Sequence, residues 1–111
     1  MQQEALTQIA RILGPEDVID RLGSSALGRD LSPGELAALH SLIQERVHVL
    51  AEALVEEAAS CDDVIDSASA QSYLDDRLVF FGQLITPELA EGVRRGFTQR
   101  VQAWGEPGPG D

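Results

Sequence analysis

Ser32-Pro33-Gly34-Glu35 opens the stretch that decides the fold, and LAALHSLIQERVHVLAEALVEEAAS follows it at residues 36–60. The four-residue start is a capping box. Its serine oxygen can accept a hydrogen bond from the amide of Glu35, while the Glu35 carboxylate can reach back to the amide of Ser32. The sequence therefore predicts that a helix begins at this point.

A near-continuous 4-3-4 spacing of side chains that suit an apolar face follows this start. Its members are Leu36, His40, Ile43, Val47, Leu50, Leu54 and Cys61. Side chains at this period share one face of a helix. We expect an all-α protein in which one long central helix, from about Pro33 to Ser60, packs against shorter helices.

The length of this central helix leads to a prediction about assembly. About 28 residues rising about 1.5 Å each span roughly 42 Å. A compact chain of 111 residues has a radius of gyration of only about 13 Å, so short helices cannot easily cover such a length. We therefore expect a homodimer in which a second copy buries part of the face. The predicted interface residues are Leu36, His40, Ile43, Val47, Leu50 and Leu54.

Two short helices are predicted before the central one. A one-sided apolar stripe extends to Leu13 and is interrupted by Gly14. Pro15 suits the first position of a second helix, and Gly23 stops that helix after about two turns.

Two more helices are predicted after the central one, which makes about five in all. Asp66 or Ser67 can cap the first of them, whose apolar side chains continue to Ile85. Thr86-Pro87 starts the second, which continues to Trp104.

The glycines in the C-terminal part of the chain predict two different features, a close helix contact and a disordered tail. Gly92 and Gly96 lie four residues apart on the last predicted helix, where they lower helix propensity but allow another helix to approach closely. The Gly/Pro-rich residues 105–111 have no apolar anchor, and we expect them to be a disordered tail. Residues 1–104 then form a single helical domain.

The composition limits the class of protein. The chain has 111 residues, 43% hydrophobic and 24% charged, as expected for one folded domain. No apolar run approaches the roughly 20 residues that cross a bilayer, and the N-terminus lacks the basic start of a secretory signal, so we expect a cytoplasmic protein. The single cysteine, Cys61, excludes an intramolecular disulfide.

The charge balance narrows the choice of partners. Nineteen acidic residues face eight basic ones, all of them Arg, and the formal net charge is −11. Such a surface repels the phosphates of nucleic acids and anionic lipid headgroups, so we expect neither nucleic acid nor membrane as a partner. Basic protein faces, divalent cations and cationic small molecules remain electrostatically suitable.

One spacing suggests a metal site. Glu45 precedes His48 by three residues and Glu52 follows it by four, so all three can share one flank of the central helix. The Glu-x-x-His spacing is found in carboxylate-bridged metal bundles, which need two such motifs. A two-fold axis in a dimer duplicates every ligand and could supply the second motif.

An acidic cluster is the other candidate for binding a divalent cation. Its members are Glu52, Glu56, Glu57, Asp62, Asp63 and Asp66, with Asp75 and Asp76 further along the chain. Carboxylates from adjacent helices suit Mg²⁺, which could then act in phosphate-ester or nucleotide chemistry. The spacing does not match the Glu-Glu-x-x-Glu run of small helical nucleotide pyrophosphohydrolases, because Ser60 stands where the third Glu would be.

Together these patterns favour a small acidic, non-catalytic interaction or regulatory module that acts as a homodimer. The alternative is a metal-dependent protein or enzyme that uses His48, Glu45 and Glu52 or the acidic cluster. We interpret His40 as a neutral imidazole hydrogen-bonded across a helix pair, and Cys61 as an unreactive core residue.

Overall fold

The computed structural model describes residues 2–26, 29–102 and 104, and within these residues the chain is all-helical. The six α-helices are α1 (Gln2–Leu13), α2 (Pro15–Leu22), α3 (Pro33–Glu45), α4 (Val47–Ala59), α5 (Ser67–Phe81) and α6 (Pro87–Val101). A 3₁₀ turn, η2 (Gly82–Leu84), connects α5 to α6. The predicted tail 105–111 lies outside the described residues.

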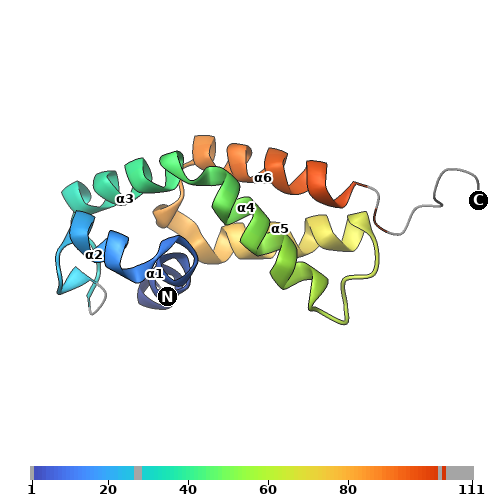
Figure 1. Cartoon of the computed structure of the whole chain (residues 1–111), viewed down its shortest axis with the longest axis horizontal. Coiled ribbons are helices and arrows are strands. Elements are labelled where there is room, and N and C mark those ends of the chain that lie inside the picture. The colour runs from blue at the N-terminus through green and yellow to red at the C-terminus, as the bar shows by residue number, and fades with distance from the viewer. Residues whose placement is uncertain (1, 27–28, 103, 105–111) are drawn as a thin grey trace, which may run out of the picture.

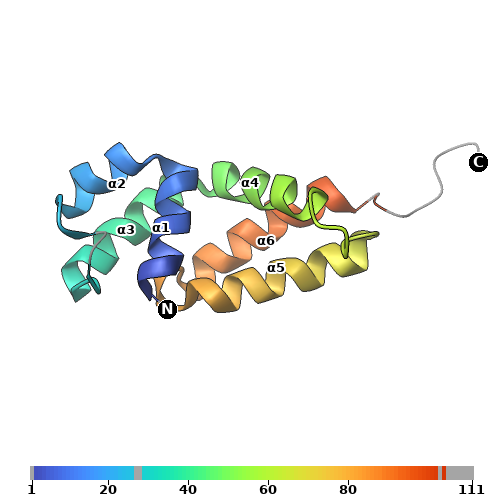
Figure 2. The same cartoon turned by 90° about the horizontal axis from the view of Figure 1, so that it is seen from below.

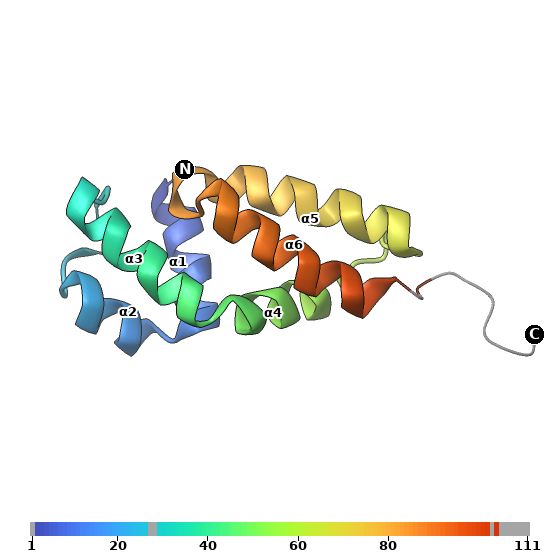
Figure 3. The same ribbon diagram turned by 90° about the horizontal axis from the view of Figure 1, so that it is seen from above.

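The helices divide between two ends of the molecule (Figures 1 and 2). One end holds α2 packed on α3, while α1 lies across the middle and contacts α2, α4 and α5. From there α4, α5 and α6 extend to the other end, where α4 and α6 finish and α5 begins (Figure 3). This second end carries the candidate site described below.

The prediction of one long central helix is wrong, because the helix breaks at Arg46. This residue leaves the helical conformation, with φ −128° and ψ 31°, and its amide bonds the carbonyl of Ile43 in a tightened last turn. Its guanidinium donates to the carbonyl of Leu13 and to the carboxylate of Asp17, at 2.6 Å each. A tertiary contact with the α1–α2 junction therefore coincides with the break, although the sequence on either side of Arg46 contains no glycine or proline.

The break also removes the reason for the predicted dimer. Two shorter helices can change direction, and each of them finds cover within the chain: α3 packs on α2, and α4 packs on α6. Ile43, Leu50 and Leu54, which we had placed in a dimer interface, are 0% exposed in a single chain. The other three predicted interface residues, Leu36, His40 and Val47, are half-buried.

A single apolar core holds the six helices together. Its largest fully buried side chains are Phe81, Phe97, Leu6, Ile9, Leu39, Leu42, Ile43, Leu50, Leu54, Leu74, Leu84 and Val18. No polar or charged side chain is buried in the described part of the chain. The core is therefore built mainly of aliphatic side chains, as the low aromatic content of the sequence requires.

The prediction that Gly92 and Gly96 admit a neighbouring helix is confirmed by the packing of α6 on α4. A Cβ added at Gly92 would lie 3.3 Å from Cγ1 of Val47. One added at Gly96 would lie 3.1 Å from Cβ of Ala51. Val47 and Ala51 are themselves four residues apart, so two matching rows face each other along the two helices.

The predicted helix starts are confirmed in detail. Ser32 accepts from the amide of Glu35 at 3.3 Å, and Glu35 accepts from the amide of Ser32 at 2.9 Å. Arg29 pairs with the same carboxylate at 2.6 Å, and this hydrogen bond is the main reason that the pKa of Glu35 falls to about 2. Thr86 caps α6 by accepting from the amide of Leu89 at 3.1 Å.

The end of α5 differs from the prediction, which continued this helix to Ile85. Gly82 has a φ of +54°, in the left-handed region that glycine adopts readily, and it ends the helix after Phe81. Leu84 is buried from the 3₁₀ turn instead, and Ile85 is extended.

We predict that Gly96→Ala lowers the free energy of unfolding by about 1 kcal/mol, since the clash with Ala51 outweighs the gain in helix propensity. Adding Ala51→Gly makes room for the new methyl group, so the double variant should be about 1 kcal/mol more stable than the sum of the single effects. Urea unfolding measures all three variants. Gly34→Ala is the control, because nothing lies within 4 Å of a Cβ added there. Equal stability of the Gly96→Ala and Gly34→Ala proteins would contradict the close packing.

We also predict that Arg46→Ala destabilises the fold by about 1–2 kcal/mol, because it removes two charge-assisted hydrogen bonds that join distant helices. Arg94→Ala, which breaks the exposed pair of Arg94 with Asp75, should cost about 0.5 kcal/mol or less. Thermal and urea unfolding compare the two. If both substitutions lower the stability equally, the contacts of Arg46 do not stabilise the fold at the break.

Candidate functional site

The residues predicted to bind a metal do not come together. Glu45 ends α3 and accepts two hydrogen bonds from Arg21, at 3.0 and 2.9 Å. His48 lies on α4, beyond the break, and is exposed. Glu52 pairs with Arg100 at 3.7 Å. The Glu-x-x-His spacing depended on one continuous helix, so the break at Arg46 separates its two members.

The acidic cluster is also divided among other roles. Asp66 caps α5 by accepting from the amide of Ser69 at 2.8 Å, and this bond is the main cause of its lowered pKa. Glu57 accepts from the hydroxyl of Tyr73 at 3.3 Å. In the described ranges no three His, Cys, Asp or Glu side chains form a group that could hold a metal ion. A site completed by a second chain stays a prediction.

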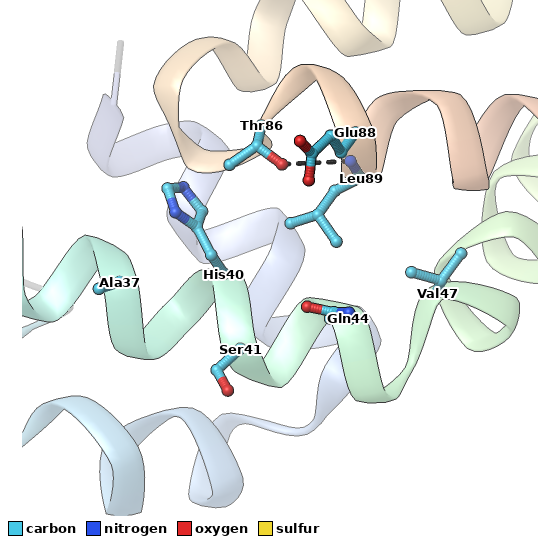
Figure 4. A pocket seen from close by; sticks show the side chains of 8 residues that line it. All are labelled: Ala37, His40, Ser41, Gln44, Val47, Thr86, Glu88 and Leu89. Atoms are coloured by element: carbon cyan, nitrogen blue, oxygen red, sulfur yellow. Dashed lines mark hydrogen bonds between the residues drawn. The ribbon is translucent and has the colours of Figure 1, made fainter.

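His40 forms a hydrogen bond between two elements of the fold, as the sequence predicted for it. Its Nε2 donates to the carbonyl of Gln83 at 2.9 Å, which ties α3 to the η2 turn. Beside it lies a cavity of about 450 Å³ between α3 and the start of α6, lined by Ala37, His40, Ser41, Gln44, Val47, Thr86, Glu88 and Leu89. Figure 4 shows Ser41 directed away from Thr86 and Glu88, so the polar groups do not aim at one point.

A second cavity, of about 340 Å³, lies at the end of the molecule where α4 and α6 finish. We call it the end groove, and its lining residues are Ala59, Val64, Ile65 and Trp104. Every one of these side chains is apolar or aromatic. Ile65 is 77% exposed, which is unusual for a large apolar side chain in this chain.

Hydrogen bonds fix the backbone around the end groove. The amide of Ser67, at the start of α5, donates to the carbonyl of Trp104 at 3.0 Å. The hydroxyl of Ser69 accepts from the amides of Ile65 at 2.9 Å and Asp66 at 3.0 Å. The backbone amide of the exposed Ile65 is thus held in place by the Ser69 hydroxyl.

An acidic pocket of about 400 Å³ adjoins the end groove. Its lining residues are Cys61, Asp63, Val64, Ser69, Ser72, Tyr73 and Asp76. Val64 lines both cavities, so it forms a wall between the apolar site and the acidic one. Burial raises the pKa of Tyr73 to about 12, and the negative charge of Glu57 adds to this shift.

Sequence reasoning missed the end groove because, in residues 62–66, it considered the acidic side chains as possible cation ligands and assigned no site to Val64 and Ile65. An apolar pair inside an acidic turn is a signal that could have identified it. Trp104 gave no such signal, since we had placed it on the last helix, which ends at Val101.

Tyr73 provides a test of this geometry, because it is the only tyrosine in the chain. At about pH 10.5 an unperturbed tyrosine is roughly three-quarters ionised, whereas a pKa of about 12 leaves Tyr73 only about 3% ionised. We predict almost no tyrosinate absorbance in the folded protein at this pH, and its appearance when urea is added. Because folding raises this pKa, the free energy of unfolding should fall as the pH rises from about 10 to 12. Ionisation of the folded protein near pH 10 would contradict the partial burial of the Tyr73 hydroxyl.

The candidate site is therefore an apolar groove and an acidic pocket on either side of Val64, at one end of the helical fold. No helix among residues 2–26 and 29–102 is both long enough and apolar enough to cross a membrane. Comparison with protein families, with curated proteins and with solved structures finds no match to this chain.

Proposed function

We propose that this protein is a small non-catalytic interaction module that docks a segment of a partner protein in the end groove. The observation that carries the proposal is Ile65, a large apolar side chain left 77% exposed beside an apolar cavity. Exposed apolar surface with a polar rim is typical of protein-binding sites. Burial of one or two such anchors supplies most of the binding energy at many interfaces.

A comparison within the chain supports this choice. Among the residues that the structure describes, Val79 is the other exposed large hydrophobic residue, at 81%, but it lines none of the cavities described above. Isolated apolar side chains are common on protein surfaces and need no explanation. Ile65 differs because Val64, Ala59 and Trp104 form an apolar concavity beside it.

The end groove is a different surface from the face that the sequence suggested for a homodimer. The core side chains of α3 and α4 are already covered by the chain itself, whereas the end groove is open. Trp104 also makes binding measurable, because it is the only tryptophan and lines the groove.

We predict that Ile65→Ser weakens binding about tenfold or more, because truncation of a dominant interface anchor costs about 2 kcal/mol or more and a tenfold change corresponds to about 1.4 kcal/mol. The probe is a random peptide library displayed on phage and selected on the wild-type protein. Enriched peptides are then synthesised, and their binding is measured by the fluorescence of Trp104. Val79→Ser is the matched control and should bind as the wild type does.

Both substitutions remove an exposed side chain, so circular dichroism and thermal unfolding should show folded proteins. The proposed function would be wrong if no peptide were enriched, or if Ile65→Ser and Val79→Ser bound the enriched peptides equally well.

A further inference from the structure

Building on the proposed function, we infer that the partner segment is basic: it places an apolar side chain in the end groove and a Lys or Arg side chain in the acidic pocket. Three features of the molecule point to this partner chemistry: the junction of the two cavities, their charges and the helix ends around them.

The two cavities meet at Val64, which lines both of them. One side of this wall offers Ala59, Ile65 and Trp104, and the other side offers the carboxylates of Asp63 and Asp76. A single partner segment lying across Val64 would contact both sides. Apolar and basic side chains close together in a sequence match this arrangement.

The two carboxylates that line the acidic pocket, Asp63 and Asp76, lie outside the ion pairs formed by the described residues. Six Arg side chains of the chain form ion pairs, with Glu45, Glu35, Asp17, Asp75, Glu91 and Glu52. Arg77 donates to Gln8 and lies over the ring of Phe80, with its guanidinium carbon 4.8 Å from the ring centre. Asp63 and Asp76 are exposed and make no ion pair within the part of the chain that the structure describes. A basic partner would supply the missing positive charge.

The helix ends add to the negative potential at this end of the molecule. The C-termini of α4 and α6, at Ala59 and Val101, both lie here, as Figure 3 shows. Helix C-termini carry partial negative charge and attract cations. The N-terminus of α5 also lies here, but the Asp66 carboxylate already caps it.

The same charges argue against a second copy as the occupant. A two-fold dimer would bring the same surface of both chains together, so the uncompensated carboxylates of Asp63 and Asp76 would face their own copies. Opposed like charges cost free energy at an interface, and each chain carries a net charge of −11. A basic partner has no such penalty.

The experiment uses the same peptide selection on the full chain, with two additional double variants. Asp63→Asn/Asp76→Asn removes two charges from the acidic pocket, and Glu16→Gln/Asp20→Asn removes two exposed charges from α2 at the other end. The two double variants have equal net charge, so any difference between them reports the position of the charge. Circular dichroism verifies that both are folded.

We expect the enriched peptides to carry Lys or Arg within a few residues of a large apolar side chain. The Asp63→Asn/Asp76→Asn protein should bind them about tenfold more weakly than the wild type, whereas the Glu16→Gln/Asp20→Asn protein should change less than about twofold. Added salt should weaken binding to the wild type more than binding to the pocket variant.

The outcomes separate this inference from the proposed function. If enriched peptides lack basic residues and bind the pocket variant normally, but still need Ile65, the inference is overturned and the proposed function stands. If binding does not depend on Ile65, the proposed function fails. A dimer in native mass spectrometry that Ile65→Ser abolishes would assign the groove to a second copy and overturn the inference.

Discussion

The close approach of α4 to α6 is the constraint on which the rest of the structure depends. Gly92 and Gly96 face Val47 and Ala51 at distances that leave little space for an extra methyl group. This contact covers the apolar face of α4 within one chain. It also brings the C-terminal ends of both helices to the same end of the molecule, where the end groove is formed (Figure 3).

Local sequence signals predicted the helix boundaries well where a residue acts on its own backbone. Ser32, Asp66 and Thr86 cap helices because their side-chain oxygens reach amides only three residues away. The break at Arg46, in contrast, coincides with a contact to a distant part of the sequence. Its partner Asp17 is 29 residues away in the sequence. The helix propensities of the residues around Arg46 do not predict that contact. A period of apolar residues can continue through such a break, because both halves still face a core.

The candidate sites show the same division between local and distant causes. His40 could be interpreted from its position on an apolar face, and its bond to Gln83 agrees with that interpretation. The predicted grouping of Glu45 with His48 assumed one continuous helix, and the break at Arg46 places the two residues on different helices. The end groove could not be derived from spacing at all. Its lining residues Ala59 and Trp104 are far apart in the sequence and meet only through the packing of α4, α5 and α6.

The hydrogen bond from Ser67 to Trp104 bears on the stage of folding at which the groove forms. It closes a loop that contains all of α5 and α6, so it forms only after both helices have docked. Loop closure over so many residues is a non-local event, and contacts of this kind form late when a small domain folds. The surface around Trp104 is therefore a property of the completed fold, and a chain in which α6 has locally detached no longer presents it.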